Sequence, residues 1–413
     1  MKLILKHLIK SSHPNFREID KLAFLSKNLY NCAVYLSRQA FFKGEKLPRL
    51  TDLHHELKNG SDYRALPAKV SQLILKQVEK TFKSYIKAIV EYRKCPDKFT
   101  GRPKLPRYKD KEKGRNIVTY NYQAISKKAL KKGFIKPSGT NLIFKTNIKD
   151  VLEVRIVPKT GAYYLEIVYE KPLSELEIEK KEDNRYAFID LGLDNLAALT
   201  SNISNFQPTL ICGKALKSCN QKYNKTLAKL KSQLPDNQKT SKSIQGLTLK
   251  RNCKVDYYLH TASRYIVNLL VFSQISLLVI GQNEGWKQNI NIGDKNNQNF
   301  VNIPHSRFIE QLTYKCELVG IKVKTINESY TSKCSFLDLE PIQKQNKYLG
   351  KRVKRGLFRA KSGYLYSSDV NGSLNIGRKV VGDAVFNGNP IERFVVNPVR
   401  VKAYKEIYSL ICL

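Results

Sequence analysis

The stretch YAFIDLGLDNLAALT, residues 186–200, sets how the second half of this chain is expected to fold. Tyr186 to Ile189 form a short apolar run of strand-forming residues, and a single carboxylate, Asp190, stands at its end. Gly192 lets the backbone turn, and LAALT follows as a second apolar run. The pattern predicts a β-hairpin that places Asp190 at the rim of a buried sheet. The alternative is a hairpin whose Asp only caps a turn.

A second carboxylate near the C-terminus favours the functional interpretation. In SSDVNGSLNIGRK, residues 367–379, Asp369 opens a helix-like run. Helical and strand-like segments alternate between the two acids, at 257–272, 277–281, 305–319 and 321–328. Alternation of this kind after an antiparallel hairpin predicts an RNase H-like α/β domain over residues 184–413. In such nucleases, carboxylates from separate elements hold two Mg²⁺ ions over the scissile phosphate.

The composition points to a nucleic-acid partner. The chain has 413 residues, with 73 Lys and Arg against 35 Asp and Glu, and its formal net charge is +38. A charge of that size and sign is typical of a protein that neutralises many phosphates. A merely basic protein, such as a ribosomal factor, would not explain the carboxylate at a buried strand. The N-terminus has no signal-peptide pattern, and the most apolar stretch, 265–280, is too short and polar to span a bilayer.

The first half of the chain combines helices and strands. Residues 18–42 and 68–94 carry apolar side chains at steps of three and four, which predicts two helices. Residues 2–9 predict a strand, and between 117 and 171 several strand-like segments are separated by Gly, Asn and Pro. These strands favour a small β-barrel.

The expected domain layout is therefore α+β followed by α/β. The first domain, 1–180, would consist of a β-barrel (1–10 and 115–172) and a helical insertion (18–100). The acidic segment 174–184 has no core-facing pattern, so the boundary is placed there.

Basic and aromatic residues mark candidate nucleic-acid contacts. The second long helix has a lysine-rich face, the connector 95–115 interleaves aromatic rings with Lys and Arg, and 214–254 holds eleven Lys and Arg with one acid. Rings and cations together can stack bases and pair phosphates, although a solvated face and a plain linker are the alternatives. The candidates from these segments are Lys76, Lys80, Lys83, Arg102, Lys104, Arg107, Tyr108, Lys225 and Lys229.

The eight cysteines are scattered and predict no metal site. No pair has CxxC spacing, and none stands beside a His at ligand spacing. We therefore expect reduced core thiols, without a zinc site or a disulfide framework.

Motifs along nearly the whole chain resemble the TnpB (OrfB) proteins of bacterial insertion sequences, relatives of the type V CRISPR effectors. The segments that carry the resemblance are LPAKVSQLILKQVEKTFKSYIKAI, GRPKLPRYKDK, FIDLGLDNLA, WKQ (286–288), ESYTSKCS (328–335) and DVNGSLNI (369–376). The resemblance implies an RNA-guided DNA endonuclease, with a guide RNA from the element's end that pairs with double-stranded target DNA. The protein itself would read only a short flanking motif.

The resemblance also implies a fold and a setting. The fold would be a recognition lobe of β-barrel and helical insert, followed by a RuvC nuclease domain. Trp286 and Lys287, in the WKQ motif, join the candidate nucleic-acid contacts. We expect a bacterial cytoplasmic protein, at the nucleoid when on DNA, with no membrane association and a monomeric state.

The chain departs from the family pattern at a zinc ribbon. The family carries four zinc-binding cysteines in the segment that corresponds to 331–366, whereas only Cys334 remains here. We expect a degenerate zinc ribbon that binds no zinc. The basic run 344–361, with eight Lys and Arg and no acid, is expected to hold nucleic acid or form a loop instead. Its candidate contacts are Lys351, Arg352 and Arg355.

A second departure concerns the middle carboxylate of the nuclease site. The family places it at the end of the strand that reads LLVIG here, where Gly281 stands. Glu284 in the following loop and Glu328 at the end of the next strand are the two possible replacements. Because neighbouring strand ends reach the same metal pair, Glu328 is the stronger candidate.

The predicted metal ligands and catalytic residues are thus Asp190, Glu328 and Asp369, with two Mg²⁺ ions. Asn371 and Asn375 follow Asp369 and are candidates for orienting it or the substrate. Two alternatives remain. A nuclease-dead, RNA-guided DNA-binding protein would follow if neither Glu reaches the metals. A DNA-strand-joining transposase would bind element ends without RNA.

Overall fold

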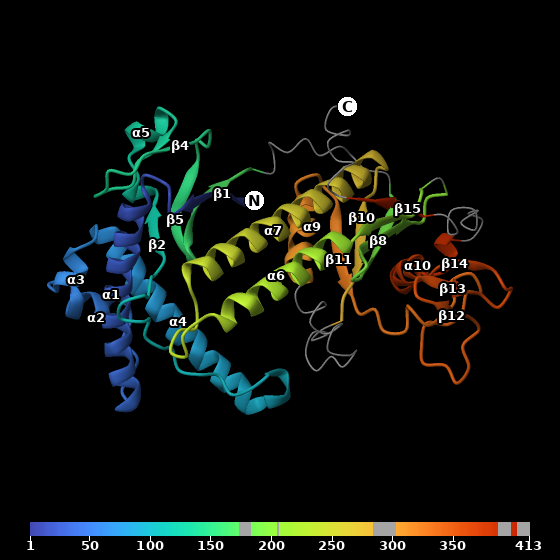
Figure 1. Cartoon of the computed structure of the whole chain (residues 1–413), viewed down its shortest axis with the longest axis horizontal. Helices are drawn as coiled ribbons and strands as arrows, with labels where there is room; N and C mark the ends of the chain where they lie inside the picture. Colours follow the sequence, from blue (N-terminus) through green and yellow to red (C-terminus); the bar gives the residue numbers. More distant parts are fainter. Residues whose placement is uncertain (173–182, 205, 284–302, 387–397, 403–413) are drawn as a thin grey trace. The chain divides into compact units, whose positions relative to one another are not determined.

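The computed structural model describes residues 1–172, 183–204, 206–283, 303–386 and 398–402, and it divides into two units. Unit 1 comprises Met1–Glu175 and unit 2 comprises Leu176–Leu413 (Figure 1). Both units combine helices and sheets, which confirms the expected mixture of α and β structure. No helix in these ranges is long and apolar enough to cross a membrane.

Unit 1 is built around two long helices that share one core. The helices of this unit are α1 (Phe16–Phe42), α2 (Leu50–Leu57), α3 (Ser61–Arg64), α4 (Ala68–Lys94) and α5 (Lys127–Lys131). The buried residues of α4 include Val70, Ile74, Val78 and Phe82, which recur every four positions and therefore form one face. That face packs with buried residues of α1 in a single hydrophobic cluster. The opposite face of α4 carries the lysines.

The sheet of unit 1 has four antiparallel strands in the order β1-β6-β5-β2. These strands are β1 (Lys2–Lys10), β2 (Val118–Asn121), β5 (Val151–Lys159) and β6 (Ala162–Glu170), and β3 (Phe134–Ile135) pairs separately with β4 (Phe144–Lys145). Strand β1 thus pairs with β6, a strand that follows the helices in sequence, and the helical insertion stays a prediction. Within the described residues the four strands pair in an open order, so closure into a barrel stays a prediction.

The basic connector between α4 and β2 is bound along α1. Asn31 donates to the carbonyl of Lys109 and accepts from its amide, both at 2.9 Å. Arg38 donates to the Pro106 carbonyl at 2.8 Å and also lies over the Tyr108 ring, 5.3 Å from its centre. The connector is therefore a docked segment of the surface, which presents its cations in fixed places.

Unit 2 contains a six-stranded sheet in the order β11-β10-β7-β8-β9-β15. Its strands are β7 (Tyr186–Leu191), β8 (Asn195–Ser201), β9 (Thr209–Cys212), β10 (Leu277–Gly281), β11 (Lys322–Ile326) and β15 (Val399–Val401). The first three form an antiparallel meander. On the other side of β7, β10 and then β11 run parallel to it, and β15 runs parallel to β9. The carboxyl ends of β7, β10 and β11 therefore meet at one edge of the sheet.

Helices pack on both faces of this sheet (Figure 1). They are α6 (Lys214–Ser232), α7 (Lys242–Phe272), α9 (His305–Glu317) and α10 (Ser368–Val381). Ala187 and Ile189 of β7 lie in one cluster with α7 and α9, whereas Phe188 lies in another with α10. Because side chains alternate along a strand, Asp190 shares the α10 face with Phe188.

A small antiparallel sheet precedes α10, in the segment predicted to be a degenerate zinc ribbon. It consists of β12 (Lys351–Lys354), β13 (Leu357–Arg359) and β14 (Leu365–Ser367). Phe358 and Tyr366 are buried against each other and against α10. All four residues of β12 are exposed, so the strand presents a basic edge to solvent.

Candidate nuclease site

Asp190 stands at the end of β7 against α10. The helix can approach this carboxylate only because residue 372 is Gly: a Cβ there would lie 2.6 Å from the Asp190 Oδ2 atom. Ordinary van der Waals contact begins near 3.4 Å. Gly372 therefore allows the close packing of strand and helix that brings Asp190 beside the first turn of α10.

Asp369 lies in that first turn. Its Oδ2 atom accepts a hydrogen bond from Asn195 Nδ2 at 2.7 Å, and Ser368 Oγ donates to Oδ1 at 3.3 Å. Asn195 belongs to β8, so the hairpin that carries Asp190 also orients Asp369. The two carboxylates line one pocket of about 190 Å³, together with Leu191, Gly192, Asn195, Ala198 and Arg352.

Glu328 lies two residues beyond β11, at the edge where the parallel strands end. Asn283, two residues beyond β10, fixes it twice: Asn283 Nδ2 donates to Glu328 Oε1, and the Glu328 amide donates to Asn283 Oδ1, both at 3.2 Å. Lys379 of α10 donates to the carbonyls of Asn327 and Ser329, each at 3.0 Å. Neighbouring strand and helix thus both hold the turn that carries Glu328.

The Glu328 carboxylate occupies space that Gly281 leaves open. A Cβ at position 281 would lie 2.8 Å from Glu328 Oε2 and 2.4 Å from Ile376 Cδ1. Glu328 Oε2 is buried and has no hydrogen-bond partner within the described ranges. The acid in the turn after β11 therefore lies against the end of β10 at Gly281.

Burial and neighbouring charges raise the pKa of two of the three carboxylates. Burial raises the pKa of Asp190 well above its usual value, and the negative charges of Glu328 and Asp369 raise it further, against the lowering effect of Arg352. Burial also raises the pKa of Glu328 to about 7, while Lys379 opposes the shift. A cation bound between buried acids opposes both causes of the raised pKa, because its charge stabilises the ionised carboxylates against burial and against their mutual repulsion.

The donor set fits Mg²⁺, which prefers carboxylate oxygens and retains several waters. Across the described ranges, no three His, Cys, Asp or Glu side chains already stand at metal-binding spacing. Asp190 and Asp369 line one pocket, whereas Glu328 lies at the same edge of the sheet and has a buried oxygen with no partner among the described residues. Closing onto a cation would satisfy that oxygen.

Asn371 and Asn375 are fully buried, so the structure does not place them where substrate could be contacted. Asn371 Oδ1 accepts from the Phe336 amide at 2.9 Å and the Tyr366 hydroxyl at 2.6 Å. Both side-chain amides donate to the Cys334 carbonyl, at 2.9 and 2.7 Å. They hold the turn that follows Glu328 onto α10, which is a positioning role.

The predicted nucleic-acid contacts lie on several surfaces. Lys76, Lys80, Lys83, Arg102, Lys104, Arg107, Tyr108, Lys225, Lys229, Lys351, Arg352 and Arg355 are all exposed. Glu284, Trp286 and Lys287 lie outside the described residues. Of the exposed set, Arg352 lines the carboxylate pocket, and Arg355 pairs with Asp194 at 2.6 Å.

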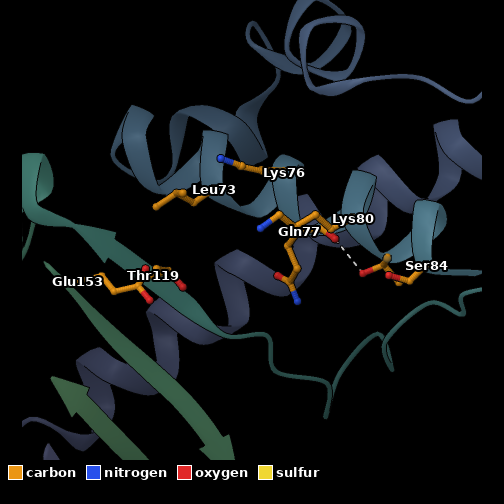
Figure 2. Close-up of a pocket in the computed structure, with 8 residues that line it drawn as sticks. Leu73, Lys76, Gln77, Lys80, Ser84, Thr119 and Glu153 are labelled. Atoms are coloured by element: carbon orange, nitrogen blue, oxygen red, sulfur yellow. Dashed lines mark hydrogen bonds between the residues drawn. The ribbon is translucent and has the colours of Figure 1, made fainter. Parts of the chain in front are cut away.

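A groove in unit 1 groups two of these lysines with residues that the sequence patterns did not single out. It lies between α4, β2 and β5 and has a volume of about 410 Å³; Lys76, Gln77, Lys80, Thr119 and Glu153 are among its lining residues (Figure 2).

The Gln77 amide in this groove is fixed from beneath. Buried Asn116 donates from Nδ2 to Gln77 Oε1 and to Ser26 Oγ, both at 3.1 Å. Asn116 and Gln77 are 39 positions apart in sequence, so no local pattern could have indicated that they pair.

Two family models match this chain. The OrfB model, described as a probable transposase, matches residues 166–287, and the Cas12f1-like TNB domain model matches residues 305–376. The TnpB-like protein ORF457 of Acidianus two-tailed virus is 25% identical over 428 residues, covering 95% of this chain and 89% of that protein.

Solved structures of guided effectors are more distant. A cryo-EM structure of a Cas12f1–sgRNA–target DNA complex is 15% identical, covers 91% of this chain and 98% of that one, and has a TM-score of 0.36. The mini-RNA-guided endonuclease Cas_phi3 is 11% identical, with 92% of each chain covered and a TM-score of 0.46.

The places of the sequence matches are informative. The first model spans Asp190, and the second spans Glu328 and Asp369, so between them they cover all three predicted acids. The viral relative then extends the likeness along almost the whole chain. The chain is thus similar in sequence to the OrfB and Cas12f1-like TNB family models and to a TnpB-like viral protein, in agreement with the predicted resemblance to the TnpB (OrfB) proteins.

Proposed function

We propose that this protein is an RNA-guided, Mg²⁺-dependent DNA endonuclease whose metal ligands are Asp190, Glu328 and Asp369. One observation carries the proposal: Glu328 fills the space above Gly281, so a third acid reaches the strand edge where Asp190 ends. The strand order of unit 2, with an antiparallel meander followed by two parallel strands, supports its assignment as an RNase H-like (RuvC) domain.

The chain's own residues would set the geometry of the reaction. Asn195 orients Asp369, and Asn283 with Lys379 orients Glu328, so each acid would be held before substrate binds. Two Mg²⁺ ions held by these acids would supply the nucleophile and stabilise the leaving 3′ oxygen. Arg352 at the same pocket would pair with a phosphate of the bound strand.

We assign the reading of the flanking DNA motif to the groove of unit 1. The Gln77 amide is held in place by Asn116, with Lys76 and Lys80 beside it. Lysines pair with backbone phosphates, whereas the Gln77 amide, which keeps one N–H and one oxygen lone pair beyond its bonds with Asn116, can pair with a base edge. In guided effectors the protein reads only this short motif, and the guide reads the remaining sequence.

The proposal is tested by identifying the RNA that co-purifies with the protein and by measuring DNA binding with and without that RNA. With a net charge of +38, we expect it to purify with a structured RNA and to bind target DNA poorly once that RNA is removed. Sequencing the RNA would identify the guide. Equal sequence-specific DNA affinity with and without RNA would refute the proposal and favour a transposase. Guided binding without cleavage in Mg²⁺ or Mn²⁺ would indicate a nuclease-dead protein.

A further inference from the structure

The segment between Glu328 and α10 has a buried acid that the nuclease chemistry does not use. Glu340 is 2% exposed. Its Oε2 atom accepts from the Ser335 amide at 2.7 Å, and its Oε1 atom accepts from the Leu349 amide at 2.8 Å. One carboxylate therefore joins two backbone positions that are fourteen residues apart, and the second of them directly precedes Gly350 and β12.

Further hydrogen bonds attach this joint, which consists of Glu340 and the backbone at Ser335 and Leu349, to α10. Arg378 Nη1 donates to the Glu340 carbonyl at 3.1 Å, and the Glu340 amide donates to the Ser335 carbonyl at 3.1 Å. Asp338 accepts from the Lys361 amide at 2.8 Å, which links the same turn to the loop between β13 and β14. A zinc ribbon joins its two turns through one metal ion. Here two carboxylates make the equivalent cross-links to backbone amides.

The one cysteine left in this segment is engaged as a thiol. Cys334 Sγ is buried and donates to the Pro341 carbonyl at 3.4 Å. Burial raises the pKa of this thiol, which favours the protonated form over the thiolate that metals bind. Cys334 thus packs within the turn that Glu340 closes.

The residues that Glu340 joins lie next to the strand that lines the carboxylate pocket. The strand that follows Leu349 carries Arg352, the cation in the pocket with Asp190 and Asp369. At its start, Gly350 packs so closely on Phe358 that a Cβ would lie 2.4 Å from the ring. Two contacts therefore fix the beginning of β12: the hydrogen bond from the Leu349 amide to Glu340, and the packing of Gly350 on the Phe358 ring.

We propose that Glu340 is a positioning residue: its buried carboxylate replaces a structural metal in this segment and holds the β12–β13 hairpin so that Arg352 stands at the nuclease pocket. Only the consequence for cleavage rests on the proposed function. The structural part concerns the hairpin alone and is tested without RNA, DNA or activity.

Glu340→Gln is the sharpest variant, because it keeps the shape of the side chain and turns one acceptor into a donor that faces an amide. We expect the amides of residues 349–359 to exchange with deuterium about tenfold faster in the full-length variant. Glu310→Gln, which changes an exposed acid on α9, is the matched control and should exchange like the parent. The parent hairpin should be insensitive to 1,10-phenanthroline.

The cleavage measurement separates positioning from general loss of stability. Glu340→Gln should lower the single-turnover rate while leaving the affinity for guided DNA unchanged. The double variant Glu340→Gln/Arg352→Ala should be no slower than Arg352→Ala alone, because both changes remove the same guanidinium from the pocket. A purely destabilising change would instead add to the Arg352 effect.

Two results would overturn the inference: hairpin exchange in Glu340→Gln equal to that of the parent, or a stoichiometric zinc whose removal loosens the parent hairpin. If Glu340→Gln does not fold, Glu340→Asp carries the same comparison, since its shorter side chain reaches only one of the two amides. A parent that never cuts DNA would defeat the proposed function, and hairpin exchange would still decide this inference.

Discussion

Replacing Gly281 by Ala should disable the nuclease by displacing an acid on a different strand. The added Cβ would stand 2.8 Å from Glu328 Oε2, where ordinary contact begins near 3.4 Å, so the carboxylate must move by about 0.6 Å. Ile376 Cδ1, at 2.4 Å from the same Cβ, must also move, by about 1 Å. Neither adjustment touches Asp190 or Asp369.

The expected magnitude follows from this shift. Misplacing a catalytic group by about 1 Å can lower a rate about a hundredfold, so a shift of about 0.6 Å should lower single-turnover cleavage by roughly tenfold to a hundredfold. Guided DNA binding should be unchanged, because the pairing of guide and target does not involve this edge of the sheet. Crowding against Ile376 should cost about 1–3 kcal/mol in the free energy of unfolding.

A second substitution separates the two effects. Ile376→Val removes the Cδ1 atom and leaves Cγ1 at 3.1 Å, so Gly281→Ala/Ile376→Val should regain part of the lost stability and still cut slowly. Gly246→Ala is the matched control, since a Cβ there meets nothing within 4 Å. Gly281→Glu/Glu328→Ala/Ile376→Val, which places an acid on β10 and removes the Cδ1 atom that its Cβ would meet, should cut faster than Glu328→Ala/Ile376→Val. Cleavage by Gly281→Ala at the parent rate would refute the argument that Glu328 occupies this space for catalysis.

Three further predictions concern Glu328, Gly372 and the buried Lys315. Glu328→Gln should lower cleavage by orders of magnitude while guided binding survives, and Glu284→Gln should cut like the parent; the reverse result in a cleavage assay would make Glu284 the ligand. Gly372→Ala should also slow cleavage without weakening guided binding, because its Cβ would lie 2.6 Å from Asp190 Oδ2, and an unchanged rate would count against that packing. Burial lowers the pKa of Lys315 to about 8 from an ordinary value of 10.5, so the unfolded chain binds more protons than the folded protein between those values and stability rises with pH there. Denaturant unfolding at two pH values in this window should show that rise in the parent and not in Lys315→Met, and equal slopes would contradict the assignment.

Regular elements with a clear period could be predicted from the sequence. The steps of three and four in 68–94 correspond to α4, and the apolar run LLVIG corresponds to β10. The elements that the patterns missed are short or lack a period. β12 is KRVK with every residue exposed, and α2 and α3 together span only part of 50–64. Their conformations depend on contacts with the rest of their unit, which no local pattern contains.

The candidate site could be predicted only in part for the same reason. Asp190 and Asp369 stand beside strong periodic segments, and Glu328 follows a strand next to β10, so one sheet edge could be inferred. The space above Gly281 depends on side chains from three elements that are distant in sequence. The burial of Asn371 and Asn375 likewise depends on the turn that packs over them. The metal-binding role of the three acids stays a prediction.

One helix contacts the surroundings of all three acids. α10 carries Asp369 in its first turn, contacts Asp190 through Gly372, and holds the turn of Glu328 through Lys379. An acid placed on β10 itself would be held by the register of the sheet. An acid placed beyond β11 lies outside that register, so its position depends on the hydrogen bonds with Asn283 and on the turn that Lys379 of α10 holds. We therefore expect the candidate site to be more sensitive to changes at Asn283 and along α10 than a site with an acid at position 281 would be.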